Sequence, residues 1–200
     1  MRIRKLLLVI AAALAMAIVL TACGGSEEGQ TPDDVVAPDA PEQTQQQSAE
    51  EQANAPEDPT LNITVPSMER LSNSPIPDTL GDDEEALRNF AGLHLQGTGF
   101  PWQDEANVYI AGHRLGYPNT ASFLAFWDID NVVEGDQVFV TDANGREYTY
   151  EVFQTLEVDP TDLFVTEPLE GRNILTLQSC TLPDYERRVV VQAELQDTRA

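Results

Sequence analysis

Cys180 and His113 have the residue types and positions that a thiol nucleophile and its titratable partner require. Cys180 follows the β-rich run Asn-Ile-Leu-Thr-Leu-Gln-Ser and precedes a seven-residue loop, and His113 follows the apolar segment Tyr-Ile-Ala-Gly. Catalytic groups concentrate on loops at strand ends, because a rigid sheet holds them there within reach of a substrate. The two positions therefore predict cysteine-based chemistry at the ends of two strands.

Each of these residues also has a structural interpretation. A lone cysteine is more often buried and inert than reactive, and a single histidine at a strand end is more often structural. The chain has two cysteines, Cys23 and Cys180, and two histidines, His94 and His113. Two cysteines are too few for a disulfide framework or a thiolate metal cage. We predict structural roles for His94 and for Arg114, the latter in supporting the loop beside it.

Residues 1–22 have the pattern of an export signal. Three basic residues near the start precede fifteen apolar residues, 6–20, and the sequence Leu-Thr-Ala then leads into Cys23. This ending resembles the bacterial lipobox, in which the cysteine is lipidated and becomes the mature N-terminus. We therefore predict a lipoprotein-type signal peptide over 1–22 and lipid attachment at Cys23. The alternative is an ordinary signal peptide or a short membrane anchor.

Residues 23–60 have the composition of a disordered tether. From position 24 onward this segment contains ten acidic residues, six Gln and five Pro, with no Lys, Arg or aromatic residue. It cannot bury enough apolar surface to offset its chain entropy. The whole chain carries a net charge of -23, which disfavours nucleic-acid binding because that function needs a basic face.

Residues 61–200 are predicted to form a mostly β domain that contains the candidate site. Short alternating runs separated by turn residues favour a closed or nearly closed β-barrel. One short helix is predicted over 82–90 and a second from 119 or 120 to 127. The strands are predicted over 61–65, 106–111, 137–141, 146–156, 173–180 and 188–195.

Three motifs in this domain resemble the His, Cys and Arg signature of the sortase family of cysteine transpeptidases. They are Ala-Gly-His-Arg around His113, Thr-Leu-Gln-Ser-Cys-Thr around Cys180, and Arg-Val-Val-Val beginning at Arg188. The resemblance covers the whole domain and implies a closed eight-stranded β-barrel with short helices. Asn-Val-Tyr-Ile-Ala-Gly-His-Arg, together with Glu-Gly-Asp-Gln-Val-Phe-Val, is most similar to class E.

The resemblance implies a role for each matching residue. Cys180 is the nucleophile, His113 is the general acid and base, and Arg188 stabilises the oxyanion or the substrate. Arg187 is the second choice for the arginine, because the family's arginine directly precedes the terminal apolar strand and alternation sends Arg187 to the opposite face. Ser179 stands where the family often has Thr, a change that keeps the hydroxyl.

The implied activity is cleavage of a sorting motif of the Leu-Pro-Xaa-Thr-Gly or Leu-Ala-Xaa-Thr-Gly type between Thr and Gly. The partners are exported proteins with C-terminal sorting signals, and the acceptor is an amine of a cell-wall precursor or a pilin. No cofactor is implied, and no acidic run has the spacing of a dedicated calcium loop. The implied location is the extracytoplasmic face of a bacterial, Gram-positive membrane, through the lipid anchor.

Three other functions are alternatives to a sortase. An L,D-transpeptidase places His and Gly directly before its nucleophile, whereas Gln178 and Ser179 precede Cys180 here. Papain-like hydrolases place the cysteine before the histidine in the chain, the reverse of this order. A non-enzymatic, sortase-like lipoprotein that serves as a binding module is the third alternative and the main competitor.

Overall fold

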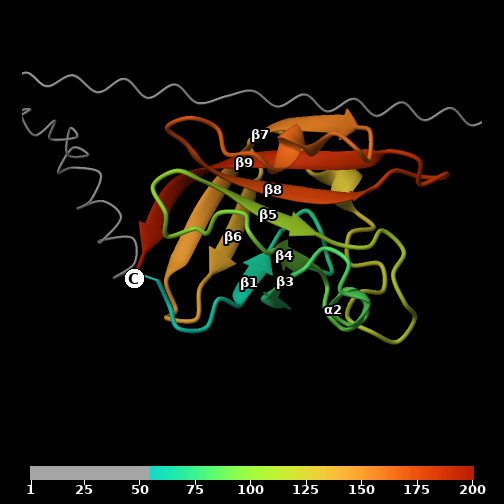
Figure 1. Ribbon diagram of the computed structural model, residues 1–200, viewed down its shortest axis with the longest axis horizontal. Helices are drawn as coiled ribbons and strands as arrows, with labels where there is room; N and C mark the ends of the chain where they lie inside the picture. The colour runs from blue at the N-terminus through green and yellow to red at the C-terminus, as the bar shows by residue number, and fades with distance from the viewer. Residues whose placement is uncertain (1–54) are drawn as a thin grey trace, which may run out of the picture. The chain divides into compact units, whose positions relative to one another are not determined.

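The computed structural model describes residues 55–200, which contain nine strands in one curved sheet (Figure 1). The predicted leader, Cys23 and the tether as far as residue 54 lie outside the described residues. No helix within 55–200 is both long and apolar enough to cross a membrane.

The strand order makes the sheet a nearly closed barrel. The order is β2-β1-β6-β7-β9-β8-β5-β4-β3, and the two edge strands, β2 and β3, are separated in sequence only by Pro77. The family resemblance implied eight strands, and the structure has nine. Pro77 separates β2 from β3, because proline lacks the N–H that a continuous strand would need. The bounds are β1 Leu61–Thr64, β2 Ser74–Ile76, β3 Asp78–Thr79, β4 Leu93–Leu95, β5 Ala106–Ala111, β6 Gln137–Thr141, β7 Glu147–Val158, β8 Asn173–Cys180 and β9 Arg188–Arg199.

The alternation of side chains gives the sheet two distinct faces. On the inner face of β8, Leu175 and Leu177 join the main hydrophobic core of the barrel. The outer face of the sheet carries a smaller cluster that includes Tyr109, Val158 and Val190. Because successive strand residues point to opposite faces, Cys180 shares the outer face with this cluster.

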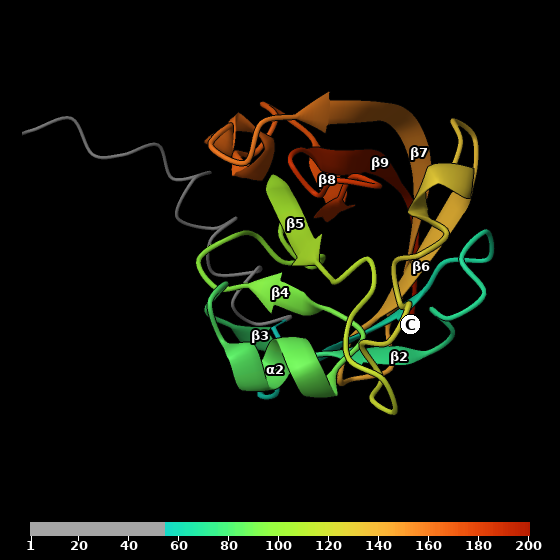
Figure 2. The same ribbon diagram turned by 90° about the vertical axis from the view of Figure 1, so that its right-hand side faces the viewer.

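One of the two predicted helices is confirmed. The helix α2, Glu84–Asn89, begins after Asp83, whose carboxylate accepts hydrogen bonds from the backbone N–H groups of Glu85 and Ala86. It lies next to β3 and β4 (Figure 2). Asp83 is an N-cap of the kind that starts helices.

The second helix, predicted to end at 127, is wrong. This segment is a series of turns, and the short 3-10 helix η1, Ile129–Asn131, follows it. Leu124 has φ +56°, which an α-helix does not accept. Its N–H donates to the carbonyl of Leu115, and the N–H of Phe126 donates to that of His113. Tertiary hydrogen bonds therefore replaced the helical ones, although Phe126 is buried as a core residue.

Candidate active site

The parallel pairing of β5 with β8 brings the histidine and the cysteine to the same end of the sheet. The register runs from Ala106 opposite Asn173 to Ala111 opposite Gln178. Beyond it, the Gly112 N–H donates to the Gln178 carbonyl at 3.1 Å. His113 follows Gly112 and Cys180 lies two residues after Gln178, so both residues lie at this strand end.

A side-chain hydrogen bond fixes this junction. The hydroxyl of Ser179 donates to the carbonyl oxygen of Gly112 at 2.8 Å, and Ser179 is almost completely buried. The residue before the cysteine is thus bonded to the residue before the histidine. The hydroxyl that Ser179 shares with the threonine common at this position in the family serves this structural contact.

The antiparallel pairing of β8 with β9 places Cys180 directly opposite Arg188. Cys180 is a free thiol and is half-buried. Opposed residues in an antiparallel pair project to the same face, so the thiol and the guanidinium share the outer face. The following loop is closed by the Thr181 N–H, which donates to the carbonyl of Arg187 at 3.0 Å.

The two adjacent arginines have different partners. The guanidinium of Arg187 forms ion pairs with Glu157 at 2.8 Å and Asp159 at 3.6 Å. Arg188 donates through Nη1 to the carbonyl oxygens of Tyr185, at 3.2 Å, and Arg187, at 3.0 Å. Its Nε and Nη2 have no hydrogen-bond partner among residues 55–200 and remain available to a ligand. The contacts therefore favour Arg188 over Arg187 as the arginine of the site.

The imidazole of His113 is held by an aromatic contact and not by a hydrogen bond. Its ring meets that of Tyr117 edge-on, with centroids 5.6 Å apart, and Arg88 lies 4.5 Å above the Tyr117 ring. The Nε2 atom of His113 is buried and has no hydrogen-bond partner within the described residues. A buried nitrogen without a partner is unfavourable, so Nε2 has unused hydrogen-bonding capacity.

Close packing under the strand end requires glycine at position 112. A Cβ on Gly112 would overlap the ring of Phe126 and lie 2.8 Å from the carbonyl oxygen of Ala91. The backbone of His113 is also tied to Phe126, whose N–H donates to the His113 carbonyl at 3.3 Å. Glycine therefore lets the segment carrying His113 lie directly on the core.

Two residues that were assigned structural roles have matching contacts. Arg114 is buried and forms an ion pair with Asp130 of η1, which ties the loop after His113 to its far end. His94 is fully buried, with Nδ1 2.7 Å from the carboxylate of Asp78 and Nε2 2.9 Å from the carbonyl oxygen of Gly99.

The sequence reasoning missed one polar pair on the outer face. The Tyr109 hydroxyl donates to the amide oxygen of Gln178, two residues before Cys180. Burial raises the pKa of Tyr109, and the nearby positive charge of Arg188 opposes this shift. Alternation along β8 was the signal that could have found Gln178, since it places this residue on the same face as the thiol. The contact with Tyr109 could be found only from the register between β5 and β8, which the sequence does not give.

Clusters of metal-ligating side chains are absent from the described residues. Residues 55–200 contain no group of three or more His, Cys, Asp or Glu side chains arranged to hold a metal ion. The strand pairings bring a thiol, an imidazole and a guanidinium to one end of the sheet.

Comparisons with known proteins identify a family for this fold and site. The family model described as the sortase domain matches residues 63–196. Sortase A from Streptococcus agalactiae serotype III (strain NEM316) is 30% identical over 136 residues, which cover 68% of this chain and 52% of that protein. The chain thus spans about half the length of the curated relative that it matches.

Solved structures show the same fold. Sortase C1 from Streptococcus agalactiae is 29% identical with a TM-score of 0.56, covering 68% of this chain and 66% of that chain. Sortase A from Corynebacterium diphtheriae is 26% identical with a TM-score of 0.60, covering 72% and 63%. Sortase E from Streptomyces avermitilis is 26% identical with a TM-score of 0.59, covering 71% and 90%. The three classes match about equally well, so class E stays a prediction from the sequence motifs.

Proposed function

The chain belongs to the sortase family, and we propose that it is a cysteine transpeptidase that transfers exported proteins from a sorting motif to an amine. The main observation behind the proposal is that Cys180 lies opposite Arg188 at the strand end where β5 leads into His113. Three groups from three separate strand ends serve one reaction there. None of them needs a metal or an organic cofactor for the steps below.

In the first step the thiolate of Cys180 attacks the carbonyl carbon of the Thr–Gly bond. The imidazolium of His113 and the guanidinium of Arg188 favour the thiolate, because a nearby cation stabilises it. The unpartnered Nε and Nη2 groups of Arg188 can donate to the oxyanion of the tetrahedral intermediate. His113 then gives its proton to the leaving glycine nitrogen, and a thioester to Cys180 remains.

In the second step an amine attacks the thioester carbon. Neutral His113 takes a proton from the attacking nitrogen, the C–S bond breaks, and the Cys180 thiolate leaves from the new amide. The imidazolium is thereby regenerated together with the thiolate. Water in place of the amine would release a carboxylic acid, so the same groups also support hydrolysis.

The substrates and location follow from the family resemblance. The proposed motif is of the Leu-Pro-Xaa-Thr-Gly or Leu-Ala-Xaa-Thr-Gly type, carried near the C-terminus of an exported protein. The proposed acceptor is an amine of a cell-wall precursor or a pilin. The enzyme would act on the extracytoplasmic face of the membrane, attached through lipid on Cys23 and reaching outward on the tether of residues 23–60.

Mass spectrometry with peptides of both motif types tests this activity. The chain from residue 55 onward is incubated with each peptide, with and without a glycine or diamine acceptor. We expect an acyl adduct on Cys180 without an acceptor, a transpeptidation product with one, and neither in Cys180→Ala. An absence of adducts across a broad peptide panel, with the thiol confirmed free, would favour a non-enzymatic binding module.

A separate measurement tests the anchor. In cells that make the full chain, Cys23→Ser should move the protein from the membrane fraction to the soluble fraction. Cys180→Ser is the matched control, because it changes the other cysteine and should leave the protein in the membrane fraction. Unchanged membrane retention of Cys23→Ser would rule out lipid attachment as the anchor.

A further inference from the structure

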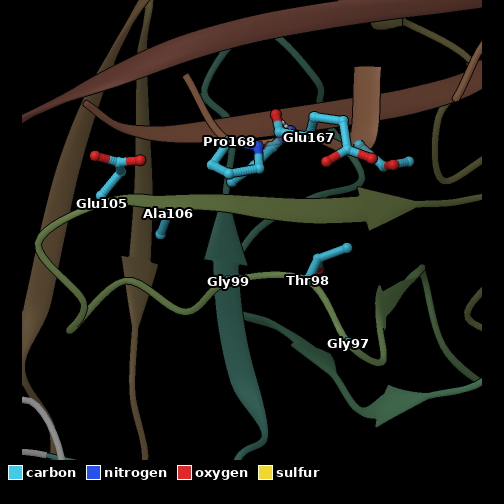
Figure 3. Close-up of a pocket in the computed structure, with 9 residues that line it drawn as sticks. Gly97, Thr98, Gly99, Glu105, Ala106, Glu167 and Pro168 are labelled. Carbon is cyan, nitrogen blue, oxygen red and sulfur yellow. Dashed lines mark hydrogen bonds between the residues drawn. The ribbon is translucent and has the colours of Figure 1, made fainter. Parts of the chain in front are cut away.

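A cavity with an acidic lining lies at the end of β5 opposite to His113. Its volume is about 230 Å³. In Figure 3 the Gly97–Gly99 backbone runs on one side of β5, and Glu167 and Pro168 lie on the other. The cavity is lined by Gly97, Thr98, Gly99, Glu105, Ala106, Asn107, Thr166, Glu167 and Pro168. No basic side chain is among these residues.

Asn107 lines this cavity and has an unused hydrogen-bond acceptor. The side chain is buried, with 1% of its surface exposed. Its amide nitrogen donates to the carbonyl oxygens of Val165 at 2.8 Å and Glu167 at 3.0 Å. Its amide oxygen is buried without a hydrogen-bond partner in the part of the chain that the structure describes. A buried unpartnered acceptor is unfavourable, so a ligand that donates a hydrogen bond there would be stabilised.

Six hydrogen-bond donors of the lining are already used within the protein. Each donates to a backbone carbonyl oxygen, whereas the side-chain oxygens of Asn107 and the two glutamates can accept hydrogen bonds. These donors are the N–H groups of Thr98, Gly99, Ala106 and Glu167 and the hydroxyl groups of Thr98 and Thr166.

The acceptors at the mouth of the cavity carry negative charge. Glu105 and Glu167 are both exposed. One carboxylate oxygen of Glu105 accepts from the N–H of Gly171 at 2.8 Å, which fixes its position. Two exposed carboxylates and one buried carbonyl acceptor in the same lining match a cation with several N–H donors. An ammonium or guanidinium group has this chemistry.

The cavity lies on the same face of the sheet as Cys180. Asn107 pairs with Ile174 of β8, and Ile174 lies an even number of residues before Cys180, so both point outward. Six residues separate Asn107 from His113, which corresponds to about 20 Å along a strand. A group in the cavity is therefore too far away to be the reacting amine, but an extended peptide of about six residues joins the two places.

We infer that this cavity binds a lysine or arginine side chain of the exported protein, about six residues from the scissile bond on its acyl side. The inference rests on the proposed function. The acyl segment stays attached to Cys180 through both steps, whereas the glycine leaves and the amine must enter in its place. Contacts made by the acyl segment therefore retain the substrate throughout the reaction. The basic residue would lie about two positions before the Leu of the motif.

Two measurements test this inference with one peptide series. The peptides share one sorting motif and carry Lys, Ala or Glu at the fifth, sixth or seventh position upstream of the scissile bond. Binding of labelled peptides to the Cys180→Ala protein is measured by fluorescence anisotropy, which needs no catalysis. Transpeptidation by the unmodified protein gives kcat and KM separately.

We expect the best-placed Lys peptide to bind about fivefold more tightly than its Ala counterpart, the size of one partly screened charge contact. The gain should appear in KM and not in kcat. Glu167→Gln should remove it, whereas Glu134→Gln, which changes an exposed carboxylate elsewhere, should preserve it. High salt should weaken it.

Several results would overturn the inference. Equal binding of the Lys and Ala peptides is one, and an equal loss in Glu167→Gln and Glu134→Gln, which would mean a general effect of charge, is another. A Glu167-dependent rise in the activity of both peptides on adding Ca²⁺ would assign the cavity to a metal ion. Adducts on Cys180 without a Lys preference would leave the proposed function intact. A Lys preference in binding without adducts would leave this inference standing while the transfer reaction fails.

Discussion

The two histidines of this chain differ in their burial and in the hydrogen-bond partners of their ring nitrogens. His94 is fully buried, and both of its ring nitrogens face oxygen atoms, those of Asp78 and Gly99. His113 is half-buried and its Nε2 has no hydrogen-bond partner among residues 55–200. The first histidine has both ring nitrogens within hydrogen-bonding distance of oxygen atoms, and the second has a buried ring nitrogen without a partner at the strand end that carries Cys180.

This difference separates a residue that holds the fold from one available for chemistry. The carboxylate of Asp78 and the carbonyl oxygen of Gly99 hold the His94 ring through both of its nitrogens. The contacts tie β3 to the wall of the acidic cavity at Gly99. His113 depends on packing against Tyr117 and on the backbone around Gly112. Sequence alone treats both as histidines near glycines.

The largest effect is expected from His113→Gln. Loss of the general acid and base should lower kcat/KM for transpeptidation by roughly 10²- to 10⁴-fold. The free energy of unfolding should change by less than about 1 kcal/mol, because Nε2 makes no hydrogen bond that could be lost. Peptide kinetics and urea denaturation measure the two quantities. A large loss of stability with little loss of activity would reverse the comparison between the histidines.

The second prediction extends the comparison to the two arginines beside the site. Arg188→Ala should lower kcat by roughly 10²- to 10³-fold, the usual effect of removing one oxyanion donor. Arg187→Ala removes exposed ion pairs with Glu157 and Asp159, which contribute about 1 kcal/mol or less, and should leave kcat nearly unchanged. Equal kinetic losses in the two variants would contradict the assignment of Arg188.

The third prediction concerns His94→Gln. This change leaves the carboxylate of Asp78 without its buried partner and should lower the free energy of unfolding by about 3 kcal/mol. The kcat for a peptide without an upstream basic residue should stay within about twofold of the unmodified protein, because His94 and the catalytic groups share no partner and changes at such independent sites act separately. Denaturant unfolding and kinetics at a temperature where both proteins are folded check this outcome. A collapse of kcat in the folded variant would place His94 in the chemistry.

The smallest effect is expected at the cap of α2, next to the His94 region. The pKa of Asp83 is lowered because its carboxylate accepts from the N–H of Ala86 and the hydroxyl of Thr79. A lowered pKa stabilises the fold above the unfolded value, and this contribution is lost as the pH falls below it. Asp83→Asn should therefore flatten the fall in stability below about pH 4, the ordinary range of Asp. An unchanged acid-unfolding curve would contradict this role.

The sequence predicted the strands and the turns between them better than it predicted the long loops. The strands that contain Tyr109, Cys180 and Val190 were predicted because apolar alternation is a local property. The turn segment around Leu124 was predicted to be a helix, since its aromatic spacing fits one. Its positive φ and its bonds to the His113 strand end depend on distant residues. Local pattern could not anticipate them.

The amino-acid sequence by itself determined which residue types were present and in what order. The motifs around Cys180, His113 and Arg188 resemble those of the sortase family, and this resemblance predicted a mostly β cysteine transpeptidase. The predictions for Cys23 and for the tether as far as residue 54 also rest on sequence alone, since these residues lie outside the described part of the chain.

Only the tertiary structure decided how these residues meet. The register of β8 against β9 set Cys180 opposite Arg188, and partner contacts separated Arg188 from Arg187. The register of β5 against β8 placed Asn107 and an acidic cavity on the face that carries the thiol. Strand pairing joins residues far apart in the chain, and a slip of one residue would move every side chain to the other face. The composition of a segment does not specify that register, whereas the packed sheet does.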